Sequence, residues 1–257
     1  MMQRIEKVDE ARFKGWARAL RRLCWIPLSV IVASVAACRQ PAEDNDPRIR
    51  GLDRVPTVQV LKRLYPRDYA SLRAAVLQAR NIDEGNAALG KTLADVSNRQ
   101  LPKAGPEQAY ALFLVKRDEG RALQATNPAG CAAFMEGRGA PPGLDDFVTA
   151  DLAARDRAAS SQMLEQTATR PAAPAAPMPR REYAGVAIAA LSRLPGADRD
   201  LALKMLRAQR AAKTPDEARA MCAYRIGLAD QLLALPSAEA GARIRAVQAA
   251  DQARLTH

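Results

Sequence analysis

Apolar residues along most of this chain recur every three or four positions, the spacing of an amphipathic helix. The clearest example is the set Met221, Tyr224, Leu228, Leu232 and Leu235. Just before it, Thr214 can cap a helix, Pro215 suits the first helical position, and Glu217 can complete a capping box. The pattern predicts a helix from about residue 215 to Pro236, with Cys222 facing the core or its edge.

The same period predicts helices elsewhere in the chain. We expect them around 69–76, 88–96, 106–114 and 144–168, and starting near 183, 197 and 237. Gly130-Cys131 should begin a short turn, and 137–143 should form a loop. Sustained alternation typical of strands is nearly absent, while strong helix formers dominate. We therefore predict an all-α fold, either an irregular helical bundle or a short stack of helical hairpins.

Two stretches rich in proline or polar residues divide the chain. Residues 38–55 are polar and contain Pro41, Pro47 and Gly51, which favours a flexible tether. Residues 170–181, with four prolines among alanines, predict a linker in extended polyproline geometry. The organisation expected is a helical part at 56–169 and a second helical part at 182–257 that packs on it.

The N-terminus has a different pattern. Residues 1–22 carry seven Lys or Arg and three Asp or Glu, and the mostly apolar run 23–37 follows. Such a run is shorter than the roughly 20 residues of a membrane-spanning helix and fits the core of a secretory signal peptide. Its end, Val35-Ala36-Ala37-Cys38, resembles the lipobox of bacterial lipoproteins. An uncleaved anchor, or a buried helix that ends in cysteine, is the alternative.

The resemblance implies a specific processing of the N-terminus. Residues 1–37 would be the signal peptide, Cys38 would receive a diacylglycerol on its thiol, and the new amine would be acylated, for example with palmitate. In lipoproteins of enterobacterial type, Asp after the cysteine retains the protein at the inner membrane. By that resemblance, Arg39 favours the outer membrane of a Gram-negative bacterium, with the protein facing the periplasm.

Removal of the leader changes the charge and the cysteine count. The 220 remaining residues contain 32 Lys or Arg and 25 Asp or Glu, a net charge of +7. An anionic envelope component is therefore a candidate partner. The bases are scattered among acids, and no aromatic residues interleave with them on a basic face, so nucleic acid is not an expected partner.

Cys131 and Cys222 are the two cysteines left once Cys24 leaves with the leader and Cys38 is acylated. In the oxidising periplasm such a pair predicts a disulfide, and closing a loop of about 90 residues would contribute roughly 4–5 kcal/mol. Two separate buried thiols are the alternative. His257 is the single histidine and there is no CxxC motif, so no metal site is predicted.

The sequence contains one weak candidate for catalytic chemistry. The sequence contains no GxSxG, GxGxxG or P-loop motif, so no cofactor is predicted. Asp145-Asp146 is the obvious carboxylate pair, but acids at a helix start usually cap it or complement its dipole. Glu136 and Glu217 are expected to be solvated or to act in capping.

Three functions remain compatible with these patterns. The preferred hypothesis is a non-catalytic, outer-membrane-anchored lipoprotein that binds an envelope component or serves as a scaffold for it. A second hypothesis is a periplasmic inhibitor, of the immunity type, that neutralises a secreted hydrolase. A third is an enzyme that cleaves peptidoglycan or another polymer with two carboxyl groups facing each other roughly 5–9.5 Å apart.

Overall fold

The chain divides into Met1–Asp44 and one compact unit, Asn45–His257. The computed structural model describes residues 46–139, 141 and 144–255. The predicted signal peptide, Cys38 and Arg39 therefore lie outside the described residues. Within the described ranges all regular structure is helical, which confirms the predicted all-α class.

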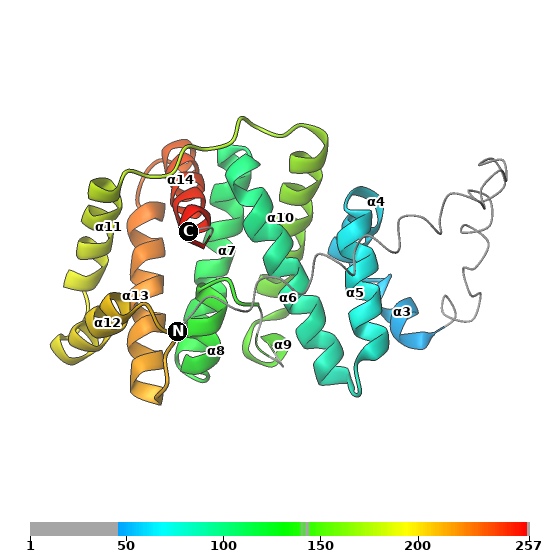
Figure 1. Ribbon diagram of the computed structural model, residues 1–257, viewed down its shortest axis with the longest axis horizontal. Coiled ribbons are helices and arrows are strands. Elements are labelled where there is room, and N and C mark those ends of the chain that lie inside the picture. Colours follow the sequence, from blue (N-terminus) through cyan, green and yellow to red (C-terminus); the bar gives the residue numbers. More distant parts are fainter. Residues whose placement is uncertain (1–45, 140, 142–143, 256–257) are drawn as a thin grey trace, which may run out of the picture. The chain divides into compact units, whose positions relative to one another are not determined.

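The helices follow one another through short connections (Figure 1). In chain order they are α3 (Pro47–Leu52), α4 (Pro56–Leu64), α5 (Pro66–Gln78), α6 (Ile82–Gln100), the 3₁₀ turn η1 (Leu101–Lys103), α7 (Pro106–Gln124), α8 (Pro128–Met135), α9 (Leu144–Phe147), α10 (Ala150–Thr169), α11 (Arg180–Ser192), α12 (Gly196–Ala208), α13 (Pro215–Leu233) and α14 (Ser237–Leu255).

Proline and capping residues determine where these helices start. The helices α3, α4, α5, α7, α8 and α13 each begin at a proline, whose missing N–H costs nothing at the first position. Side-chain oxygens of Asn81, Thr149 and Thr214 accept hydrogen bonds from the first turns of α6, α10 and α13. The helix starts near Pro106 and Pro215 are thus as the sequence predicted.

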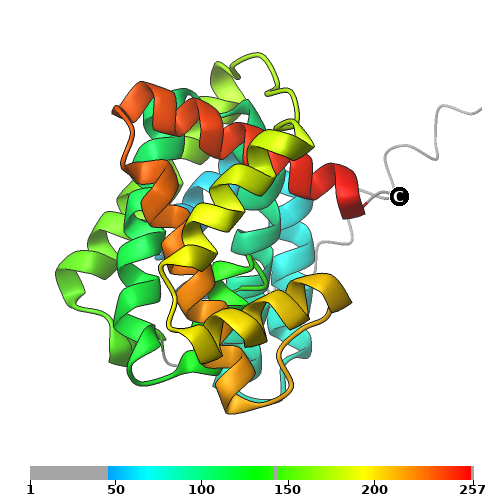
Figure 2. The same cartoon turned by 90° about the vertical axis from the view of Figure 1, so that its left-hand side faces the viewer.

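Two hydrophobic clusters fill the unit. We call the first cluster the N-core; it is formed by α3–α6, the first half of α7, α10 and α14. We call the second cluster the C-core; it is formed by the end of α7, α8, α11, α12 and most of α13. The helices α11 and α12 pack on the outer side of α13 (Figure 2).

The helices α7 and α13 belong to both cores. On α7, Leu112 lies in the N-core and Leu123 in the C-core; on α13, Met221 lies in the C-core and Leu232 in the N-core. The cores are therefore not separated at the Pro/Ala segment, because each draws residues from both sides of it. Since Asn45–His257 contains both cores and both long helices that join them, it is a self-contained folding unit.

The segment predicted as a linker is attached to the folded body. Residues 170–179 run extended over the molecule from α10 to α11 (Figure 1), and we call this segment the strap. Backbone N–H groups of Ala172 and Ala175 donate to carbonyls of η1, and Met178 N–H donates to Ala246 of α14. Met178 is also buried in the N-core. The predicted range 170–181 is corrected at its end, because α11 already begins at Arg180.

The tether predicted at 38–55 is wrong for its second half. Residues 47–52 form α3, whose Ile49 and Leu52 are buried in the N-core. The Arg48 guanidinium donates to the carbonyls of Val76, Leu77 and Ala79 at the end of α5. These tertiary contacts stabilise α3, although its short, proline-containing sequence does not predict a helix.

Two local predictions also need correction. The single helix expected at 144–168 is two helices, α9 and α10, because the chain leaves the helix at Val148 and Thr149 caps a new one. The turn expected at Gly130-Cys131 is the eight-residue helix α8, capped by Asn127.

Candidate functional site

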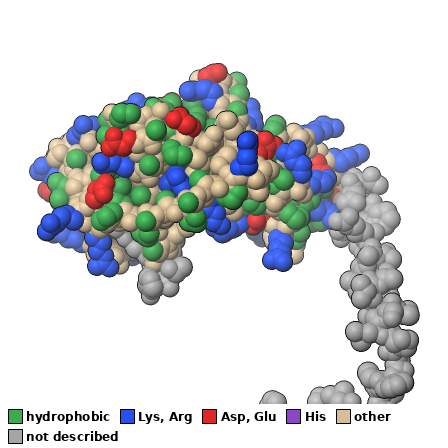
Figure 3. Space-filling view, turned by 90° about the horizontal axis from the view of Figure 1, so that it is seen from above, with side chains coloured by type: hydrophobic (Ala, Val, Ile, Leu, Met, Phe, Trp, Pro, Cys, Tyr) green, Lys and Arg blue, Asp and Glu red, His purple; other side chains and the backbone are tan. Residues whose placement is uncertain are grey.

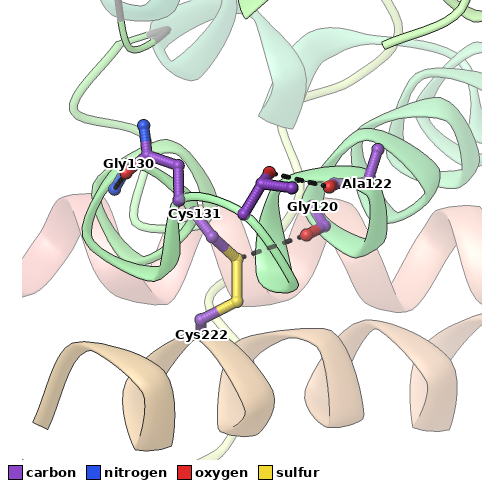
Figure 4. Close-up of a disulfide and its surroundings, with 7 residues drawn as sticks. Gly120, Ala122, Gly130, Cys131 and Cys222 are labelled. Atoms are coloured by element: carbon purple, nitrogen blue, oxygen red, sulfur yellow. Dashed lines mark hydrogen bonds between the residues drawn. A yellow bond between two sulfur atoms is a disulfide. The ribbon is translucent and has the colours of Figure 1, made fainter. Parts of the chain in front are cut away.

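A disulfide joins Cys131 of α8 to Cys222 of α13 (Figure 4). Their Cα atoms are 5.5 Å apart, and the two residues are 91 positions apart in the sequence. Both cysteines are fully buried in the C-core, and Cys131 Sγ lies 3.3 Å from the Gly120 carbonyl oxygen on α7. The bond therefore connects residues on opposite sides of the strap at the point where three helices meet.

The sequence around Cys131 explains how α8 reaches this position. Asn127 Oδ1 accepts a hydrogen bond from Gly130 N–H, and a Cβ on Gly130 would lie only 2.6 Å from the Asn127 amide. On the facing helix, a Cβ on Gly120 would lie 2.5 Å from Met135 Sδ. Gly120 thus permits the close approach of α7 and α8, and Gly130 leaves room for the Asn127 side chain that caps α8 itself.

The surroundings of the disulfide indicate a structural role. Thiol–disulfide exchange requires a thiolate to reach one of the sulfurs, so access determines its rate. Neither cysteine is exposed to solvent in the folded unit. We therefore interpret the bond as a cross-link between α8 and α13 and not as a redox centre.

The acidic residues singled out from the sequence are dispersed. Asp146 lies exposed on α9, and the Asp145 side chain is outside what the structure describes. Glu136 forms an ion pair with Arg138. Glu217 lies at the start of α13, so the structure does not gather these acids into one site.

Glu217 is held by a dense set of donors. The Arg210 guanidinium donates to both carboxylate oxygens, and Lys213 N–H donates to Oε2 at 2.9 Å. In return, Thr214 Oγ1 accepts from Glu217 N–H at 3.3 Å, which is the predicted capping interaction. The bonds from Arg210, and then from Lys213, lower the pKa of Glu217 to about 2. Glu217 is thus a capping group that is ionised at neutral pH and unsuited to proton transfer there.

Neither of two shallow depressions on the described surface pairs two carboxyl groups. One, of about 340 Å³, lies between α4, α7 and α10; its one carboxylate, Glu165, forms an ion pair with Arg63. The other, of about 680 Å³, lies along α12 and includes Asp200 together with Lys204 and Arg207. Neither therefore has the two opposed acids that glycoside hydrolysis requires.

Within residues 46–139, 141 and 144–255, no cluster of three His, Cys, Asp or Glu side chains is positioned to hold a metal ion. In that part of the chain, no helix combines the length and the hydrophobicity needed to cross a bilayer. The large apolar side chains most exposed on the described surface are Ile82 and Ile188, which lie on different helices.

One surface feature was missed by the sequence analysis, which treated the bases as scattered. Residues 46–80, which form α3–α5, contain eight Lys or Arg and three Asp or Glu, a net charge of +5. Residues 180–213, which include α11 and α12, likewise contain eight Lys or Arg and three Asp or Glu, a net charge of +5, while residues 81–179 and 214–257 together contain 15 Lys or Arg and 17 Asp or Glu. Counting charge by segment, and not by local runs, would have revealed these two basic segments.

Comparisons with known proteins give no family for this chain. No protein-family model, no curated protein and no solved structure matches it. Its function must therefore be argued from its own residues.

Proposed function

We propose that this protein is an outer-membrane-anchored periplasmic lipoprotein of a Gram-negative bacterium that binds another envelope component without catalysing a reaction. The observation that carries the proposal is the N-terminal pattern: a basic segment, an apolar run and Val35-Ala36-Ala37-Cys38. Lipidation of Cys38 would anchor the unit Asn45–His257 to a membrane surface. Arg39 supports the outer membrane as the destination.

The cysteine arrangement supports an oxidising compartment. Disulfides persist in the periplasm and are rare in the reducing cytosol. The two cysteines of the folded unit, Cys131 and Cys222, are bonded to each other, while Cys24 and Cys38 are the two that the proposal assigns to processing. The disulfide was predicted from that processing. The N-terminal pattern and the disulfide are therefore both consistent with export of the chain to the periplasm.

The placement of the acids supports a binding role over the enzymatic hypothesis. Glu217 is ionised and occupied in capping α13, Glu136 is paired with Arg138, and Asp146 is exposed on a short helix. These acids stabilise helices and surface ion pairs. What remains to contact a partner is the charged surface of the helical unit.

The decisive experiment is acyl labelling in a Gram-negative host. Wild type grown with a labelled fatty acid should carry the label, fractionate with the outer membrane, and have acylated Cys38 as its first residue by mass spectrometry. The variant C38S should lose the label and retain residues 1–37. The matched control is C24S, which alters a cysteine inside the leader and should leave labelling unchanged.

Two results would contradict the anchor. Absence of label on wild-type protein would remove the lipoprotein assignment, as would label that persists in C38S. A wild-type chain that is cleaved elsewhere and released into the periplasm would show that residues 23–37 act as an ordinary secretory signal.

A further inference from the structure

The strap presents two of its three faces to solvent. Its inward row consists of Ala172, Ala175 and Met178, whose N–H groups donate to η1 and α14. A polyproline helix has three residues per turn, so the residues between these donors lie on two outward faces. The outward positions are all exposed: Pro171, Ala173, Pro174, Ala176, Pro177 and Pro179. Figure 3 looks down on the side of the unit that the strap crosses in Figure 1, and apolar side chains lie exposed there among charged ones.

The composition of the strap exceeds what a connection between α10 and α11 needs. Residues 171–179 contain only proline, alanine and Met178, although six of the nine are exposed and 26% of the whole chain is charged. None of the four prolines falls in the inward row, where its missing N–H would remove an anchoring hydrogen bond. The inward row thus holds the backbone, and the outward faces display proline rings to solvent.

The fold orders the strap before a partner binds. Pro179 has φ −56° and ψ 138°, close to polyproline geometry. The Arg245 guanidinium donates to the carbonyls of Pro102 and Ala173 and so joins α14, η1 and the strap. Met178 is buried in the N-core and fixes the far end of the segment. Ordering the backbone is a main cost when a flexible peptide binds, and it does not arise here because these residues are already ordered.

Arginines lie at both ends of the strap. Arg170 is its first residue, and Arg180 and Arg181 follow its last. All three are exposed, and none forms a side-chain ion pair with another described residue, whereas the adjoining Glu182 pairs with Arg243. Charged groups at an interface fix its register and orientation. A partner of the strap should therefore carry carboxylates at the ends of its binding groove.

We propose that the strap is a preformed polyproline ligand for an envelope protein whose groove is lined by aromatic side chains and bordered by carboxylates. This inference rests on the proposed function, because it names the chemistry of the envelope component that the protein binds. Aromatic-lined grooves recognise proline-rich segments through their preformed, low-entropy geometry. Ala173-Pro174 and Ala176-Pro177 each span both outward faces, so each pair fits one pocket between aromatic rings.

Photo-crosslinking in the bacterium that produces the protein tests this contact. The photoreactive residue p-benzoylphenylalanine is introduced into the full chain in place of Ala176, within the strap, or of Thr169, exposed at its edge. The control position is Ala208, which is exposed on α12. Mass spectrometry then identifies the partner and the residues of the partner that are attached to the probe.

The proline requirement is tested with matched variants. P174A/P177A removes two outward rings and keeps the three N–H donors of the strap. Its control, P195A/P215A, removes two exposed prolines outside the strap. Titration calorimetry measures the affinity of the purified cross-linked partner for residues 45–257 of wild type and each variant, and for a synthetic peptide of residues 168–182. Circular dichroism first verifies each fold.

The expected losses follow from buried area and from ordering. Each Pro→Ala substitution removes two ring carbons, and a buried CH₂ corresponds to about a fourfold change in affinity. P174A/P177A should therefore bind on the order of a hundredfold more weakly than wild type, while P195A/P215A should match wild type. The free peptide should bind about tenfold more weakly than the folded unit, which is the cost of ordering one backbone residue.

Each outcome decides the proposal. Support requires a protein adduct at positions 169 and 176 and not at 208, attached among aromatic side chains, with an affinity that falls in P174A/P177A alone. The proposal is overturned by the absence of an adduct at both strap positions, or by an adduct to lipid, to glycan or to a second copy of this chain. An attachment site without aromatic residues, equal affinities of wild type and P174A/P177A, or a peptide that binds as tightly as the unit also overturns it.

Two further measurements keep the test sharp. If P174A/P177A does not fold, P177A alone should show about a tenfold loss of affinity. Acylation of Cys38 is scored separately in the same cells. An adduct formed without acylation removes the anchor and supports the strap as a ligand, while acylation without an adduct does the reverse.

Discussion

Replacement of the two bonded cysteines by alanine is the most direct test of how the fold is held together. The variant C131A/C222A, made in residues 45–257, opens a cross-link between positions 91 residues apart. In the chain-entropy model, a closed loop of this size restricts the unfolded chain by about 4–5 kcal/mol. For a unit of roughly 200 residues, each kcal/mol corresponds to about 2–4 °C, so the melting temperature should fall by about 8–20 °C.

Thermal unfolding followed by calorimetry measures this loss, and urea unfolding gives its signature. Without the cross-link the unfolded chain expands, so the dependence of the unfolding free energy on urea should steepen. The single variants C131A and C222A are the sharpest comparison. Because either substitution breaks the same bond, each should be nearly as unstable as the double variant.

Additivity would refute this reasoning. If the losses in C131A and C222A sum to the loss in the double variant, the two residues act as independent buried thiols. A fall in melting temperature below about 3 °C would also refute the cross-link as a major source of stability. In wild type, both sulfurs are buried, so an alkylating reagent should label no thiol until the protein is both unfolded and reduced.

Two further predictions concern helix packing and pH. A Cβ at Gly241 of α14 would lie 1.9 Å from the Pro106 carbonyl oxygen, so G241A should lower the melting temperature by several degrees through overpacking of about 1–3 kcal/mol. Its control, G185A on open α11, should stabilise by about 0.5–1 kcal/mol, and equal effects in calorimetry would contradict the close α14–α7 crossing. Glu217 has its pKa lowered from 4.5 to about 2, so its ionised form stabilises the fold above pH 4.5 and that contribution is lost as the pH falls toward 2. E217Q should therefore melt below wild type at pH 7 and converge with it near pH 2; a difference independent of pH would count against the ionised cap.

Helix positions were predictable where local signals agree. At α13, a capping threonine, a first-turn proline and a long apolar face all indicate the same element, and the observed Pro215–Leu233 follows them. The helix α3 has no such agreement of local signals, because six residues are too few to show the apolar periodicity of an amphipathic helix. Its stability comes from the burial of Ile49 and Leu52 and from the bonds between Arg48 and α5. Those contacts depend on the tertiary fold and are not visible in the local sequence.

The break between α9 and α10 was visible in the sequence and was overlooked. Thr149 followed by Asp151 has the composition of a helix start, and Thr149 Oγ1 accepts from Leu152 N–H at 3.2 Å. The pairing of Cys131 with Cys222 was predictable for a different reason, since counting the cysteines that the proposed processing would leave needs no structural information.

The strap shows that a proline-rich segment, although it cannot form a helix, can still bind to the folded body in a defined way. Its prolines at 171, 174 and 177 recur every third residue, and each is followed by a residue whose N–H donates to the folded body: Ala172, Ala175 and Met178. A polyproline helix has three residues per turn, so donors at this spacing lie on one face. The proline period therefore sets the direction of the backbone donors as well as the extended geometry. Because the acceptors belong to η1 and α14, the strap binds helices from both sides of the supposed division, and the two helical parts are held as one body.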